Sequence, residues 1–123
     1  YQTSIGPSPV VGADGSSGAG IARQSTGAYI QYAGVSNSAG VHGDDKKVAS
    51  ALFDGANSEA HWKGTKILDG DVGTNTNVKR IGGNGVDRFT GKIGEIIIYN
   101  SDQSSNRTAI ETNIANQYGI TLS

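Results

Sequence analysis

A chain of 123 residues is the size of one domain, and its net charge of −1 gives no reason to expect nucleic acid or an anionic membrane as a partner. The absence of cysteine excludes disulfides and thiolate zinc sites, and no apolar run is long enough for membrane insertion. Methionine is absent too, so we expect an excerpt of a longer polypeptide, and the apolar content of 35% predicts a thin core.

Residues 1–26 are rich in Gly, Ser, Ala and Pro and predict a lead-in or an irregular edge, with a hint of a strand only at Pro9–Val11. We therefore place the folded domain at residues 27–123. The alternating pattern of Ala28–Tyr32 predicts a strand, and Lys47–Phe53 predicts the next one. Turn-forming residues follow at 54–58.

A hairpin is predicted next, because Glu59–Lys63 and Thr65–Leu68 alternate on either side of a tight turn at Lys63–Gly64. A further strand is expected at Asn77–Gly82. Phe89–Tyr99 is the longest strand candidate. Its isoleucines point to both sides, so we predict a central strand covered on both faces.

The chain then predicts one amphipathic helix. Asp102 or Ser104 can cap its start, and Gly119 suits a left-handed residue at its end. Ile110, Ile114 and Tyr118 lie on one stripe, which we expect to cover an otherwise bare patch of sheet. From these periodicities we predict that five side chains are buried: Ile96, Ile98, Ile110, Ile114 and Trp62.

Two stretches of the sequence carry a family resemblance. "GKIGEIIIYNSDQSS" followed by "RTAIETNIANQYGI", and upstream "ALFDGANSEAHWKGTKIL", resemble the C-terminal part of concanavalin A-like, laminin G-like jelly-roll domains. The resemblance covers roughly residues 28–120, with Lys63 standing where Asn is usual. It implies an all-β jelly-roll sandwich with one short C-terminal helix, possibly without some N-terminal strands. Missing strands would precede Tyr1 or be completed by a neighbour.

The same resemblance guides the expected function. Phage virion proteins and bacterial surface proteins carry such domains, so we expect a non-enzymatic structural or adhesion module. A decoration, fibre or tail-associated part of a virion is favoured, with other copies or other virion or surface proteins as partners. The expected location is a virion, the extracellular space or a cell surface.

The alternative function is a carbohydrate-binding module of a secreted bacterial protein, for which four candidate ligand-binding residues are Trp62, Tyr32, Asp54 and Asp87. A sugar site needs an exposed aromatic platform, and Trp62 is the only Trp. Because Ala60 and Trp62 share a face that we expect to be buried, core packing is the competing interpretation of Trp62.

The sequence also bears on metal binding and catalysis. Asp69 and Asp71 are candidate calcium ligands, since laminin G-like domains often bind calcium, although Asp-Gly is also common turn chemistry. Glucanases of this fold need two carboxylates on one strand, whereas Glu95 is followed at the alternate position by Ile97. The sequence has no Gly-x-Ser-x-Gly motif, which would place a serine nucleophile beside a catalytic histidine such as His42 or His61. We therefore predict no enzyme.

Overall fold

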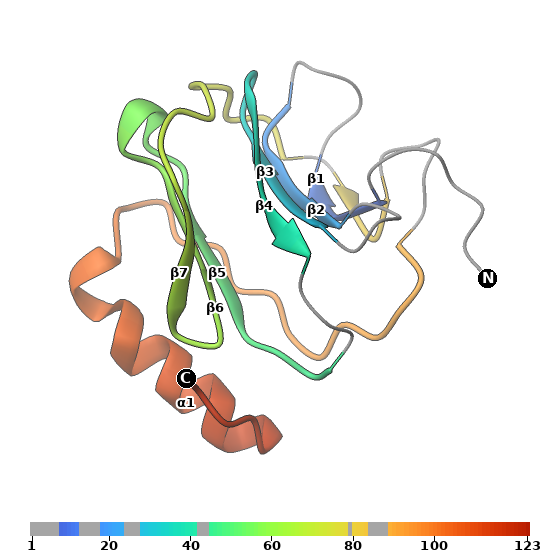
Figure 1. Cartoon of the computed structure of the whole chain (residues 1–123), viewed down its shortest axis with the longest axis vertical. Helices are drawn as coiled ribbons and strands as arrows, with labels where there is room; N and C mark the ends of the chain where they lie inside the picture. Colours follow the sequence, from blue (N-terminus) through green and yellow to red (C-terminus); the bar gives the residue numbers. More distant parts are fainter. Residues whose placement is uncertain (1–7, 13–17, 24–27, 42–44, 79, 84–88) are drawn as a thin grey trace.

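The chain forms two antiparallel β-sheets and one C-terminal helix (Figure 1). The structure is a computed structural model, and it describes residues 8–12, 18–23, 28–41, 45–78, 80–83 and 89–123. The five-stranded sheet, in the order β4-β3-β2-β1-β8, consists of β1 (Ser8–Gly12), β2 (Gly20–Arg23), β3 (Ala28–Tyr32), β4 (Ser36–Val41) and β8 (Arg80–Ile81). The three-stranded sheet, β5-β6-β7, consists of β5 (Ala49–Leu52), β6 (Glu59–Trp62) and β7 (Thr65–Asp69). The prediction of a β-rich chain that ends in one helix is confirmed.

Residues 1–26 contain more than a lead-in. β1 pairs antiparallel with β2 and with β8, and β2 also pairs with β3, so both are inner strands of the five-stranded sheet. The hint of a strand at Pro9–Val11 is confirmed by β1, whereas the loop prediction is wrong for β2. Gly20 and Ala22 are poor strand formers by propensity, but both are buried, where small size and paired backbone groups matter more than bulk.

The β6–β7 hairpin has the turn that the sequence predicted. Lys63 and Gly64 both have positive φ, 52° and 90°. Positive φ at both central residues defines a type I′ turn, whose twist matches that of the flanking strands. The strands expected at Ala28–Tyr32 and within Lys47–Phe53 are present as β3 and β5, whereas the strand expected at Asn77–Gly82 is only the two residues of β8.

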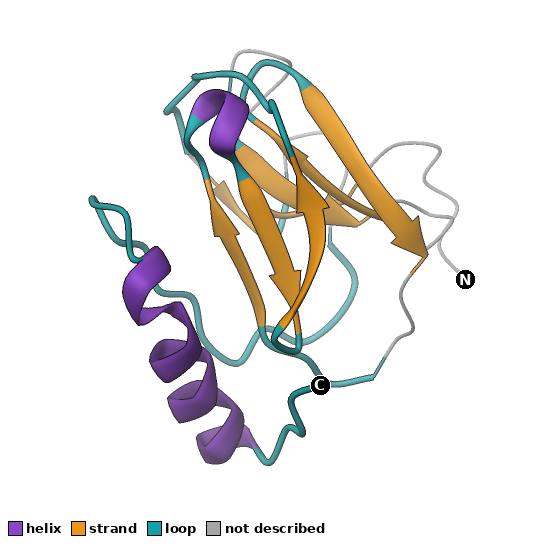
Figure 2. Ribbon diagram, turned by 60° about the vertical axis from the view of Figure 1, so that its left-hand side comes forward, coloured by secondary structure: helices purple, strands orange, loops and turns teal. Residues whose placement is uncertain are grey.

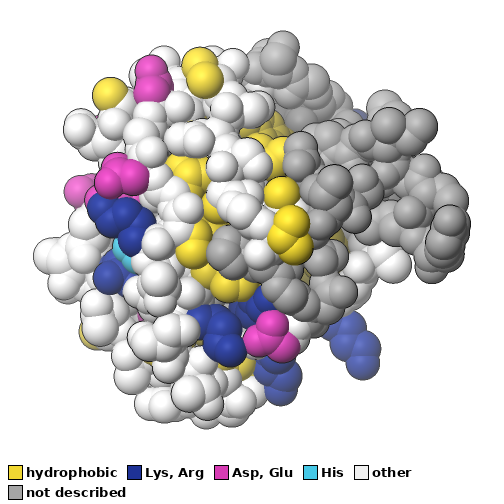
Figure 3. All heavy atoms as spheres, viewed as in Figure 1, with side chains coloured by type: hydrophobic (Ala, Val, Ile, Leu, Met, Phe, Trp, Pro, Cys, Tyr) yellow, Lys and Arg dark blue, Asp and Glu magenta, His cyan; other side chains and the backbone are white. Residues whose placement is uncertain are grey.

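The two sheets face each other across a core of mostly small side chains. Tyr29 of β3 meets Trp62 of β6 edge-on, with ring centroids 5.2 Å apart. Gln31, fully buried two residues along β3, donates from Nε2 to the carbonyl of Leu52 in β5 at 2.6 Å. In Figure 3, hydrophobic atoms appear in a strip between the sheets. The buried cluster comprises Ala19, Tyr29, Ala33, Ala39, Ala60, Leu68 and Val72.

The loop that follows β7 ties the sheets together at one end of the molecule, at the top of Figure 1. The carbonyl of Val72, a fully buried residue, accepts the N–H groups of Ala33 at 2.7 Å and Val35 at 3.0 Å in the β3–β4 turn. On the other side, Gly70 N–H donates to the carbonyl of Ser58, just before β6. The loop therefore fixes the spacing of the two sheets.

The longest predicted strand, Phe89–Tyr99, is not a strand. Phe89 N–H donates to the carbonyl of Gly82 beside β8, and no backbone hydrogen bond within the described part of the chain follows until the turn before the helix. β-Branched residues favour a strand only where a neighbouring strand offers backbone partners, and neither sheet reaches this segment. The prediction of a central strand covered on both faces is therefore wrong.

Helix α1 (Arg107–Tyr118) follows a short 3₁₀ turn, η3 (Ser104–Asn106). Asp102 lies just before this turn, and its Oδ1 accepts the N–H of Ser104 at 2.7 Å. Gly119 ends the helix in the left-handed conformation (φ 63°). Ile120 N–H then donates back to the carbonyl of Ala115 at 2.8 Å. The predicted end at Gly119 is confirmed, whereas the predicted cap is wrong: the N-cap residue of α1 is Asn106, and its side chain makes no capping hydrogen bond.

The face that α1 buries differs from the predicted one. Glu111 and Ala115 are its buried residues, whereas Ile110 and Ile114 are only half-buried. The side of the helix that faces the sheet carries positions 107, 111 and 115, one residue away from the predicted stripe. Glu111 can be buried there because its carboxylate has hydrogen-bond donors from the protein. Of the other side chains predicted to be buried, Trp62 and Ile96 are half-buried and Ile98 is 67% exposed.

The loop that joins the two sheets after β7 predicts that substitution of Gly73 is unusually destabilising. Its φ is 85°, and a Cβ there would lie 2.3 Å from the carbonyl oxygen of Ala33. We expect Gly73→Ala to lower the free energy of unfolding by about 3 kcal/mol, from left-handed strain plus the clash. The matched control is Gly82→Ala, with φ 76° and open space around it, which should lose only about 1 kcal/mol. Equal losses of unfolding free energy for the two variants in urea denaturation would contradict the role of this loop in joining the sheets.

Candidate functional site

The four candidate ligand-binding residues do not gather in one site. Trp62 packs against the core between the sheets, with Lys47 Nζ 4.9 Å from its ring centroid. Tyr32 is three residues beyond Tyr29 on β3, and because successive strand side chains alternate, it lies on the opposite face of the five-stranded sheet. Asp54 is exposed at the start of the β5–β6 loop, and Asp87 lies outside the described residues.

The candidate calcium ligands are occupied by the protein itself. Asp69 Oδ2 pairs with Lys66 Nζ at 3.1 Å, and Asp71 Oδ1 accepts the N–H of Gly73 at 2.7 Å. The described residues contain no group of three His, Cys, Asp or Glu side chains that could hold a metal ion. Asp71 thus acts as a turn-forming residue in the loop that follows β7.

A shallow depression lies at the loop end of the molecule and was not foreseen from the sequence. Its volume is about 190 Å³. Phe53 and Val78 form apolar walls and are 39% and 41% exposed. None of the described residues that line the depression is charged, so it suits a neutral group that combines an apolar face with hydroxyls. Its lining residues are Ala19, Phe53, Gly73, Thr74, Asn75, Thr76 and Val78.

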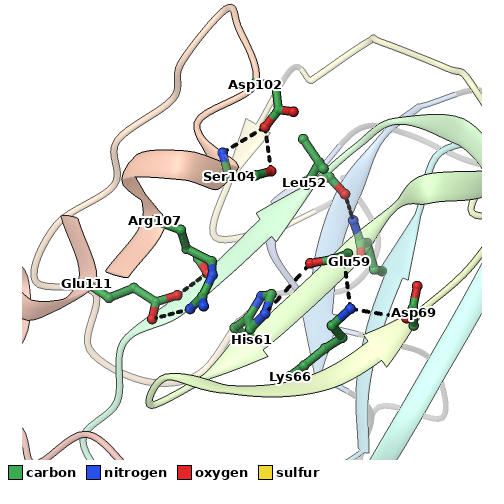
Figure 4. Close-up of polar contacts among 11 residues, drawn as sticks. Leu52, Glu59, His61, Lys66, Asp69, Asp102, Ser104, Arg107 and Glu111 are labelled. Carbon is green, nitrogen blue, oxygen red and sulfur yellow. Dashed lines mark hydrogen bonds and ion pairs between the residues drawn. The ribbon is translucent and has the colours of Figure 1, made fainter. Parts of the chain in front are cut away.

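A buried polar cluster joins α1 to the three-stranded sheet (Figure 4). The carboxylate of Glu111, only 2% exposed, accepts the hydroxyl proton of Ser50 in β5 and the guanidinium of Arg107 at 2.8 Å. Each carboxylate oxygen therefore has a donor, which offsets the cost of burying the charge. The one sequence signal for this cluster was the spacing of Arg107 and Glu111, which puts them on the same helix face.

His61 lies on β6 directly opposite Ser50 and is 5% exposed. Burial, and then the nearby guanidinium of Arg107, lower the pKa of His61 below its usual value, so the ring is neutral at pH 7. In a Ser–His–acid triad the serine hydroxyl donates to histidine. Here Ser50 donates to Glu111 instead. The cluster thus has the geometry of a structural contact between helix and sheet.

Charged side chains continue outward from this cluster. Lys66 on β7 pairs with Glu59 at 2.6 Å and with Asp69, and His61 Nε2 lies 3.8 Å from Glu59. The left side of Figure 3, over β6 and β7, shows charges of both signs close together. Because the charges alternate in sign, this surface presents no single-sign patch to a charged partner.

The most unusual surface of the chain is the unpaired segment before α1. Four of its large apolar side chains are exposed: Ile93 by 37%, Ile97 by 45%, Ile98 by 67% and Tyr99 by 48%. Gly94 lies against the ring of Tyr118, where a Cβ would be 3.0 Å from Cε1, so the segment passes alongside the end of α1. Glu95 is exposed in this segment.

No protein-family model, curated protein or solved structure matches this chain. The concanavalin A-like resemblance therefore rests on the motifs alone. Among the described residues, no helix is both long and apolar enough to cross a membrane.

The buried carboxylate predicts a strong effect of Glu111. Glu111→Ala leaves Arg107 and Ser50 without their acceptor, and we expect it to lower the free energy of unfolding by about 2–3 kcal/mol. Glu111→Gln keeps the shape and one acceptor oxygen and should lose less. The surface control is Asp69→Asn, since Asp69 is paired with Lys66 in solvent and its loss should leave the urea midpoint almost unchanged. A Glu111→Ala midpoint as high as that of the control would contradict a structural role for the cluster.

Proposed function

We propose that this chain is a non-enzymatic structural or adhesion module of a larger assembly and that residues 93–99 are its contact surface. One observation carries the proposal: four large apolar side chains are 37–67% exposed in a single continuous segment. Monomeric proteins rarely expose such clusters, and those that occur mark surfaces where other proteins bind. The two sheets and α1 act as a rigid frame that presents the segment (Figure 2).

The setting of the assembly is proposed from the family resemblance. Two antiparallel sheets and a terminal helix are compatible with a concanavalin A-like jelly roll, the finer arrangement that we propose. Domains of that kind occur in phage virions and on bacterial surfaces. We therefore favour a decoration, fibre or tail-associated part of a virion, in contact with other copies or other virion proteins. Fold alone does not determine function, so the contact surface is the part to test.

The proposed surface predicts self-association that depends on its isoleucines. Sedimentation velocity should show association of the wild type as concentration rises, and the double variant Ile97→Asn, Ile98→Asn should raise the dissociation constant about a hundredfold, since each buried Ile contributes about 1.5–3 kcal/mol. The control variant replaces Val35 and Val41 on the β4 side with Asn, two side chains that are 51% and 69% exposed. Equal weakening by both double variants, or a wild type that never associates, would refute the proposal.

A second candidate function is a carbohydrate-binding module, and the depression beside Phe53 favours it. A half-exposed aromatic ring gives a sugar an apolar surface to stack on, and Thr74 and Thr76 offer exposed hydroxyls at the rim. This site differs from the one expected from the sequence, because Trp62 packs on the core and Tyr32 lies on another face.

A glycan array tests this second candidate. Specific binding by the wild type that Phe53→Ala reduces about tenfold would support the site, since stacking on an aromatic ring contributes about 1.5 kcal/mol. Val41→Ala, which removes an exposed side chain away from the depression, is the control. Binding that survives Phe53→Ala but is lost in Tyr32→Ala would move the sugar site to the outer face of β3. If the wild type binds no glycan on the array, the carbohydrate-binding function is excluded.

A further inference from the structure

Helix α1 lies over a buried histidine, and its attachment to the sheet is mainly polar. We propose that α1 is a pH-sensitive switch: protonation of His61 releases the helix from the three-stranded sheet while both sheets stay folded. The inference goes beyond the proposed function, because it concerns the outer face of β5, β6 and β7 and not the contact surface at residues 93–99. It is carried by the small apolar contact of the helix, the position of His61 and the pairing of the charges around it.

The helix buries little apolar surface against the sheet. Its buried residues are Glu111 and Ala115, and its larger apolar side chains are only half-buried. Hydrogen bonds hold it at two places along its length. Ser50 of β5 donates to Glu111, and Lys46 Nζ donates to the carbonyl of Tyr118 at 3.0 Å. An element with so few buried apolar contacts opens at a lower free energy than the whole domain unfolds.

His61 lies on the outer face of the three-stranded sheet, under the helix. It is directly opposite Ser50, and residues opposite each other in an antiparallel pair lie on the same face. Since Ser50 donates to Glu111, α1 lies over this face, on which His61 is 5% exposed. Release of the helix would therefore move the imidazole from a buried site into water.

The charges around His61 are already paired with one another. The carboxylate of Glu111 is 2.8 Å from the guanidinium of Arg107, and Glu59 is 2.6 Å from Lys66 but 3.8 Å from His61 Nε2. These two pairs sum to zero, so an imidazolium would add a net positive charge at a buried position with no unpaired carboxylate beside it. The charged groups that face His61, from α1, β6 and β7, are Arg107, Glu111, Glu59 and Lys66 (Figure 4).

Acid should therefore favour the released helix. With α1 docked, burial and then Arg107 lower the pKa of His61 despite the two nearby carboxylates. With α1 released, the ring is in water and its pKa returns to about 6.5. Between these two pKa values the released state binds a proton that the docked state does not. The equilibrium constant for release thus rises up to about tenfold per pH unit as the pH falls below about 6.5, and it levels off below the pKa of the docked state.

Amide hydrogen exchange as a function of pH tests the switch. Protection factors, which divide out the intrinsic pH dependence of exchange, should fall about tenfold in α1 between about pH 6.5 and pH 5.5. They should also be about a hundredfold lower in α1 than in β3 at each pH, because the helix opens without unfolding of the sheets. His61→Gln removes the titrating group and should abolish the pH dependence in α1. The matched control is His42→Gln, since His42 is the only other histidine, and it should behave as the wild type.

Three results would overturn the inference. The first is a folded His61→Gln variant that keeps the pH dependence of the wild type, and the second is a wild type whose α1 protection does not change with pH. The third is equal protection of α1 and β3, because the helix would then open only when the whole domain unfolds. If circular dichroism shows that His61→Gln does not fold, NMR titration of the imidazole in the wild type decides instead: a pKa of His61 at or above about 6.5 would overturn the switch. None of these measurements depends on self-association, so the proposed contact surface stands or falls separately.

Discussion

The carboxylate of Glu111 holds α1 against the three-stranded sheet, and the course of the chain before the helix depends on that contact. A charge that is 2% exposed is stable only with donors on both oxygens, and Ser50 and Arg107 supply them. The C-terminal tail adds to the anchoring, because Ser123 N–H donates to the carbonyl of Lys63 in the β6–β7 turn at 2.6 Å. Helix and tail thus cover the outer face of this sheet.

Once α1 has taken that face, the preceding segment must run from the edge of the five-stranded sheet at β8 to the start of the helix. It makes this crossing as an extended connection without a neighbouring strand, which leaves its isoleucines in solvent. The sheets themselves are held apart at a fixed distance by the loop that follows β7 and by Tyr29 and Trp62. A rigid frame with one apolar, unpaired segment is what an assembly module requires, and it is the physical basis of the function proposed above.

The sequence predicted elements whose determinants are local. Lys63–Gly64 and Gly119 were found because their turn and cap need positive φ, and β3 because five residues alternate. It failed where the determinant is a distant partner. β2 lies among small residues and needs its neighbours to become a strand, and Phe89–Tyr99 had every local property of a strand except a neighbour. Glu111 was missed for the same reason, since burial of a carboxylate depends on Ser50, 61 residues away in the sequence.

Amide hydrogen exchange at high dilution, where the chain is monomeric, tests the central claim most directly. Exchange rates reveal which backbone N–H groups are bonded inside the molecule. The account predicts that residues 90–99 exchange at close to the rate of an unstructured peptide while β6, between its two neighbours, is strongly protected. Protection of residues 90–99 comparable to that of β6 would show that this segment is a paired strand within one copy, and the exposed contact surface would not exist.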